Sequence, residues 1–269
     1  MTGVLARPGL LVQLSLSNVF LPINKLWWFL LGAPLLTGIH ALTALLAGYP
    51  IALAIGPFGL AVILMTVAIR LALLPVAVYQ LRAARRASHE AARIKGLIGS
   101  ELDDLRKEYA KDPAALNREM ALLYQRHGIN PLSTARAGLK GVLVAGIVQA
   151  PILIAFYSAI RLFSAPTSTG GGLHFLWLHS LAMADPLLIL PIAAAITTYA
   201  LSRVTATTNK PSGPPDDAAA AAHRQAAVLM TMVVGVSAYL APAALVIYWV
   251  TGNLIAIVQQ LLLAPRILH

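Results

Sequence analysis

Five long apolar runs dominate the chain, and shorter polar segments separate them. An α-helix rises about 1.5 Å per residue, so about 20 residues cross a hydrocarbon core about 30 Å thick. The first, second and fifth runs are long enough to cross, whereas the third and fourth are short. The pattern predicts an all-α membrane protein with a bundle of five transmembrane helices, the last four within 141–263. The runs are residues 58–80, 141–162, 186–202, 226–240 and 243–263.

A polar region, residues 81–140, follows the first run. Asp112-Pro113 supplies an N-cap and a first-turn proline for a helix that ends near Gly128. In the part before Asp112, apolar residues recur at spacings of three and four, which is typical of an amphipathic helix. The region is therefore predicted to be a helical hairpin. The recurring apolar positions are Leu81, Ala84, Ala87, Ala91, Ile94, Ile98, Leu102, Leu105 and Tyr109.

The N-terminal segment, residues 1–57, holds a further apolar stretch at 27–48 that opens with two tryptophans. Tryptophan favours the membrane interface, so this stretch is predicted either to lie as a helix in the outer interface or to span the membrane or act as a signal. The segment 203–225 contains NKPSGPPDD and is predicted to be a flexible linker. Residues 264–269 are predicted to form a short cytoplasmic tail.

Lysine and arginine are concentrated in the predicted hairpin. Residues 81–140 hold twelve of the twenty, whereas the connection 163–185 holds none. The positive-inside rule then places the hairpin, the linker and the C-terminus in the cytoplasm. The hairpin either only orients the protein or forms a docking surface for a cytoplasmic or membrane partner. Candidate partner-binding residues on it are Arg82, Arg85, Arg86, Arg93 and Lys95.

Composition supports the membrane class and argues against catalysis. Hydrophobic residues make up 58% of the 269 and charged residues 11%, and there is no cysteine for a disulfide or a thiolate metal site. The net charge of +10 is local to the hairpin, so it does not indicate specific binding of nucleic acid. The sequence has no HExxH pair, no paired acids in the runs and no phosphate-binding glycine loop. We expect neither an enzyme nor a cofactor.

Arg70 lies at the centre of the first run, and no acidic residue in another run is placed to neutralise it. A guanidinium at the bilayer midplane costs about 2.5 to 3.5 kcal/mol on insertion scales, so it marks a functional site by default. Its side chain reaches about 6 or 7 Å, too short to bring the charge to either headgroup layer. Arg70 is therefore predicted to meet water and polar groups inside the bundle. It either belongs to a functional site or has a structural role, holding helices together through hydrogen bonds.

Polar side chains on the other runs are candidates for solvating Arg70. Hydroxyls and amides solvate a guanidinium without neutralising it, so the site would keep a positive potential. Gln149 also suits an interhelical hydrogen bond, and Tyr248 and Trp249 also suit packing or the interface. The principal candidates are Gln149, Tyr157, Tyr248, Trp249 and Asn253, and the others are Ser158, Thr197, Thr198, Thr251, Gln259 and Gln260.

Six motifs in order give the chain a resemblance to a known family. They are LWWFLLGAPLL, VAIRLALLPVAVYQLRAARR, REMALLYQRHGINPL, QAPILIAFYSAI, FLWLHSLAMADPLLILPIAAAITTYA and APAALVIYWVTGNLIAIVQQLLL. The chain from Leu26 onward resembles the YidC/Oxa/Alb family of membrane protein insertases. It departs from the family at Ala241-Pro242-Ala243-Ala244, where relatives tend to have phenylalanine before the proline and a glycine after it.

The resemblance implies a five-helix bundle with an amphiphilic groove that opens to the cytoplasm and the lipid. Arg70 corresponds to an arginine that helps receive hydrophilic parts of an incoming chain. The partners implied are nascent membrane proteins, membrane lipids, the Sec translocon and the ribosome, and the location is the bacterial plasma membrane. A different class, a transporter or channel for a small anion, also suits a buried arginine, although the chain lacks matched inverted repeats.

Overall fold

The computed structural model describes residues 32–130, 149, 152–154, 156–158, 160, 173–209 and 217–267. Regular secondary structure in these residues is helical, apart from one isolated bridge between Phe175 and Leu178. Most of the second apolar run and part of the stretch 27–48 lie outside the described residues. The helices are α3 (Ala33–Leu46), α4 (Pro50–Ile55), α5 (Pro57–Ala72), α6 (Leu74–Glu108), α7 (Pro113–Arg126), α9 (Ile189–Thr208), α10 (Asp217–Leu240) and α11 (Ala243–Ile267).

Two of the described helices, α9 and α11, are long and apolar enough to cross a membrane by themselves. The pair α5 and α6 meets the same criterion only when it is taken as one span with a 60° bend. The all-helical class predicted from the sequence is therefore found in the described part of the chain, with two or three helices of spanning length.

The first apolar run is divided by that bend, which differs from the single span predicted over 58–80. Helix α5 ends at Ala72, and α6 then continues without interruption for 35 residues. Pro75 lies in the first turn of α6. A proline has no N–H to donate and its ring clashes with the carbonyl four residues earlier, here that of Leu71, so a continuous helix is broken at this point.

The predicted flexible linker, residues 203–225, is helical over most of its length. Helix α9 continues to Thr208 and α10 already begins at Asp217, so helix occupies both sides of the undescribed residues 210–216. Five alanines at 218–222 explain the early start of α10, because alanine has the highest helix propensity.

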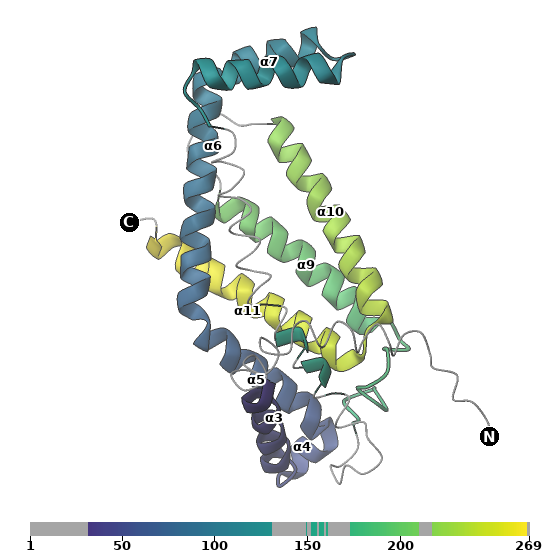
Figure 1. Cartoon of the computed structure of the whole chain (residues 1–269). Helices are drawn as coiled ribbons and strands as arrows, with labels where there is room; N and C mark the ends of the chain where they lie inside the picture. Colours follow the sequence, from purple (N-terminus) through teal and green to yellow (C-terminus); the bar gives the residue numbers. More distant parts are fainter. Residues whose placement is uncertain are drawn as a thin grey trace, which may run out of the picture.

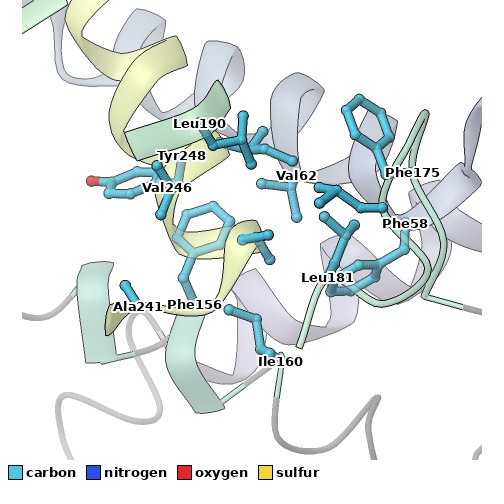
Figure 2. Packing of buried hydrophobic residues seen from close by; sticks show 14 of the residues in the cluster. Phe58, Val62, Phe156, Ile160, Phe175, Leu181, Leu190, Ala241, Val246 and Tyr248 are labelled. Carbon is cyan, nitrogen blue, oxygen red and sulfur yellow. The ribbon is translucent and has the colours of Figure 1, made fainter. Parts of the chain in front are cut away.

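Helix α11 is central to the bundle because it packs against α5 on one side and α9 on the other. Helix α10 packs on α9, and α3 packs on α5 (Figure 1). The main apolar core is formed mostly by α5, the loop before α9 and the first half of α11, together with Ile152, Phe156 and Ile160. Figure 2 shows Phe58, Phe156, Leu181 and Val246 within it. Apolar side chains along α9 and α10 are exposed in the isolated chain, as expected for surfaces that face lipid.

Residues 173–188 close one end of the bundle, which we call the loop end. The backbone N–H groups of Ala243 and Ala244, at the start of α11, donate to the carbonyls of Met183 and Leu181 at 2.8 and 3.0 Å. The Leu176 N–H donates to the carbonyl of Ile55, just before α5. Helices α5, α9 and α11 therefore all begin at the loop end and run in the same direction.

Asp185 holds this loop to α9. Its carboxylate is almost completely buried and accepts hydrogen bonds from the Trp177 indole at 3.1 Å, the Leu187 N–H at 3.0 Å and the Leu190 N–H at 2.8 Å. The bond to Leu190 satisfies an N–H in the first turn of α9, which begins at Ile189 after Leu188 in a left-handed conformation.

At the opposite end, α6 extends beyond the bundle and α7 packs against it. We call residues 82–128 the arm, and this end of the bundle the arm end (Figure 1). The two helices share a small separate core, and Asp112 caps α7 by accepting from the Ala114 and Ala115 N–H groups. Gly128 follows α7 with a φ of +63°, which favours glycine. The buried residues of the small core are Ile94, Ile98, Leu102, Leu123 and Ile129.

Candidate functional site

Arg70 lies in the last turn of α5, closer to the end of its helix than the centre of an unbroken span would be. The C-terminus of a helix carries a partial negative charge, which stabilises a cation in the last turn. The side chain is half-buried. Among the described residues, no carboxylate forms an ion pair with Arg70, so its charge is not neutralised by that part of the chain.

The guanidinium of Arg70 lies directly against Gly252 of α11. A methyl group at position 252 would come within 2.8 Å of Nη2, 3.4 Å of Nε and 3.5 Å of Cζ. A side chain at position 252 would therefore displace the guanidinium from its present place against α11. The Gln259 side chain, farther along α11, donates to the backbone carbonyl of Arg70 at 3.2 Å and joins the same two helices.

Two pairs of neighbouring residues on α11, Gly252 with Asn253 and Gln259 with Gln260, contact the helices on both sides. In each pair, the first residue faces α5 and the second faces α9. Gly252 and Gln259 are seven residues apart, so they lie on one face, toward α5. Asn253 and Gln260 have the same spacing on the next face, toward α9. Asn253 donates to the hydroxyls of Thr198 and Thr197 at 3.0 and 3.3 Å, and Gln260 accepts from Thr205 at 3.0 Å.

Tyr248 lies on the same face of α11 as Gly252, one helical turn closer to the loop end. The Gln149 amide donates to its hydroxyl at 2.6 Å, and its ring packs at 4.6 Å from that of Phe156. Figure 2 shows the ring within the apolar cluster and the hydroxyl directed away from it. The Tyr248 hydroxyl also interacts electrostatically with Arg70. Arg70, Gln149 and Tyr248 therefore form one polar region across three segments of the chain.

The other predicted groove residues are less closely associated with Arg70. Asn253 binds α9, on the neighbouring face of α11. Trp249 packs against the main apolar core. Tyr157 is 43% exposed, whereas its neighbour Phe156 is fully buried, so the two rings lie on different faces of their segment.

The predicted cations of the arm differ in their surroundings. Arg82 and Arg86 are exposed, and Lys95 is half-buried. Arg93 pairs with Glu90 at 2.7 Å, and the hydrogen bond from Arg93 holds the pKa of the Glu90 carboxyl below its usual value. Arg85 differs from the rest because its Nη2 donates to the Thr208 carbonyl of α9 at 2.9 Å.

Several residues of these contacts were not identified from the sequence, among them Gly252 and Ser88. Gly252 has no polar side chain, and only its place one turn from Tyr248 on a polar face distinguishes it. Ser88 donates to the Asn209 carbonyl at 2.6 Å, across 121 residues of sequence. Among the described residues, no cluster of His, Asp and Glu is suited to hold a metal ion.

The fold and the site define a class, a multi-pass helical membrane protein with a cationic polar region between its helices. The chain belongs to the 60Kd inner membrane protein family, whose family model matches residues 51–268. This finding confirms the resemblance that the six motifs indicated.

Several curated bacterial relatives cover most of the chain. The membrane protein insertase YidC of Caldanaerobacter subterraneus subsp. tengcongensis is 33% identical over 77% of this chain and 84% of the relative. Membrane protein insertase YidC 1 of Halalkalibacterium halodurans is 36% identical over 76% of this chain and 68% of the relative. The YidC of Clostridium perfringens is 30% identical over 91% of this chain and 90% of the relative.

Proposed function

We propose that the chain is a membrane protein insertase that receives hydrophilic segments of client proteins in a positively charged groove within the membrane and releases their apolar segments into the bilayer. The observation that carries this proposal is the Arg70 guanidinium, which lies on the polar face of α11 without a carboxylate partner in the described residues. A client carboxylate would supply the missing anion.

The polar residues around Arg70 form the floor of the proposed groove. Gln149 donates to the Tyr248 hydroxyl, and Gln259 donates to the backbone carbonyl of Arg70. These amides and the hydroxyl are uncharged, so they leave the charge of the guanidinium uncancelled. A positive potential at this depth lowers the cost of bringing a carboxylate part of the way across the hydrocarbon. The segment then crosses only the remaining thickness, and no energy source in this chain is needed.

The apolar segment of the client supplies the driving force for its own release. It moves past the lipid-facing side of the groove and leaves water for the bilayer, which is favourable for apolar surface. The membrane potential contributes about 2.3 kcal/mol per charge per 100 mV when a charged segment crosses.

The arm is assigned to the cytoplasm, together with the C-terminus, because basic residues are concentrated in it. On this orientation the loop end faces outward, and the arm is where nascent membrane proteins first arrive. The exposed residues Arg82 and Arg86 are available there for lipid headgroups, the ribosome or the Sec translocon. The plasma membrane of a bacterium is the proposed location.

The alternative of a small-anion transporter is not supported, since the curated relatives carry the name of membrane protein insertases.

A direct test reconstitutes the purified chain in lipid vesicles and presents a small single-span client with an acidic translocated segment. Protease protection of that segment is expected to rise several-fold above empty vesicles, while uptake of labelled chloride stays at background. Protein-dependent chloride uptake without client insertion would contradict the proposal.

A further inference from the structure

The contact between α6 and the C-terminus of α9 joins two parts of the chain that are about 120 residues apart in sequence. Arg85 Nη2 donates to the Thr208 carbonyl at 2.9 Å, and the Ser88 hydroxyl donates to the Asn209 carbonyl at 2.6 Å. Figure 1 shows this end of α9 beside α6. We call these four residues the clasp. Because helix C-terminal carbonyls carry partial negative charge, they attract a guanidinium.

The clasp leaves part of its hydrogen-bonding capacity unused. Arg85 Nε and Asn209 Oδ1 are both buried, and neither has a hydrogen-bond partner among the residues that the structure describes. A buried polar atom without a partner costs free energy that offsets the gain from the bonds that are made. The two unpaired atoms therefore lower the net stability of the closed clasp.

A carboxylate can accept hydrogen bonds from more of the Arg85 N–H groups than the Thr208 carbonyl can. The Nε–H and one Nη–H of a guanidinium lie parallel and match the two oxygens of a carboxylate, whereas a single carbonyl oxygen accepts from Nη2 alone. A carboxylate would therefore take up the unpaired Nε–H and also replace the bond to α9.

The clasp is placed where this exchange would affect the proposed groove. Helix α11 lies between α5 and α9, which make no extensive contact of their own. Helix α6 continues from α5, so the clasp connects the two helices on either side of α11 at the arm end. Release of α6 from α9 would free these two sides to separate where the client enters.

We propose that Arg85 is a binding site for carboxylates of the incoming client and that carboxylate binding opens the clasp between α6 and α9. This inference rests on the proposed insertase function. It places the contact of an acidic segment with Arg85 before its contact with Arg70.

A reversible cross-link tests whether the clasp opens. The chain contains no cysteine, so Ser88→Cys with Asn209→Cys introduces the only two thiols. A short bis-methanethiosulfonate reagent joins them, and reductant removes the bridge. With the bridge in place, insertion of the acidic client is expected to fall by about tenfold, and reduction should restore it.

A matched cross-link elsewhere in the bundle controls for effects of the cysteine substitutions and of the reagent. A Cβ at Gly235 would lie 3.6 Å from the Cβ of Ala195, so Ala195→Cys with Gly235→Cys joins α10 to α9 away from the clasp. Insertion should be the same before and after this bridge forms. If the bridged clasp inserts the client as fast as its reduced form, the clasp does not open and the proposal is wrong.

A second variant keeps the test independent of the cysteines. Arg85→Lys retains the positive charge but lacks the two parallel N–H donors that bind both oxygens of a carboxylate. The advantage of the acidic client over a matched neutral client, measured as the ratio of their insertion rates, should shrink by about fivefold. Equal loss for both clients, or no loss for either, would overturn the carboxylate site. Failure of the unmodified chain to insert any client would instead refute the insertase function.

Discussion

Arg70→Ala is expected to lower insertion of a client with an acidic translocated segment by about tenfold to a hundredfold. Hydrogen bonds to charged groups contribute about 1.5 to 3 kcal/mol, and about 1.4 kcal/mol corresponds to a tenfold change in rate. The variant removes the cation from the polar face of α11 and leaves Gln149, Tyr248 and Gln259 in place. The measurement is the initial rate of protease protection in reconstituted vesicles.

Two further variants distinguish the effect of the positive charge of Arg70 from the effect of where its guanidinium lies. Arg70→Lys should retain part of the activity, because it keeps a cation but not the planar guanidinium that lies on α11. Gly252→Leu should reduce insertion although Arg70 is intact, since a side chain at 252 occupies the surface on which the guanidinium lies. Arg203→Ala, at an exposed position on α9, is the matched arginine control and should insert normally. Equal rates for Arg70→Ala and Arg203→Ala would exclude a role for Arg70 in receiving acidic segments.

Asp185→Ala is expected to destabilise the protein by about 3 kcal/mol or more. The substitution leaves the Trp177 indole and the N–H groups of Leu187 and Leu190 without their acceptor, and each buried unpaired donor costs about 1 to 3 kcal/mol. The loss should appear as a lower midpoint of thermal unfolding in detergent. The unfolding midpoint of Asp185→Asn should lie between those of the unmodified protein and Asp185→Ala, because an amide keeps one of the two acceptor oxygens.

An exposed aspartate provides the control for this prediction. Asp103 pairs with Arg106 at 3.3 Å, and both side chains are more than half exposed. Because exposed ion pairs contribute little, Asp103→Ala should leave the unfolding midpoint unchanged. An unchanged midpoint for Asp185→Ala would show that the loop end does not depend on this carboxylate.

The polar faces of α11 illustrate how much of the site follows from sequence. Once 243–263 is recognised as a helix, a spacing of seven places Gly252 with Gln259 and Asn253 with Gln260. Helical periodicity defines a face but not its neighbour. The sequence therefore predicted Asn253 as a groove residue, whereas the structure shows it bonded to Thr197 and Thr198 of α9.

Interactions between distant segments were beyond the reach of sequence patterns. Arg85 was predicted as one of several equivalent arm cations, and its position in an amphipathic helix gives no indication that Thr208 lies beside it. The bend before α6 had a local signal in Pro75, but the presence of a proline does not predict the 60° angle. The family membership, in contrast, followed from six local motifs and is confirmed by the family model.

Contact between Arg70 and a client during insertion is the central claim, and site-specific photo-crosslinking measures it directly. A photoreactive amino acid at Ile69 or Leu73, on either side of Arg70, is activated while a short single-span client is being translated. Adducts to the acidic segment of the client are predicted, and they should disappear when that segment is made neutral. A correctly folded protein that inserts the client without forming adducts at either position would contradict the account.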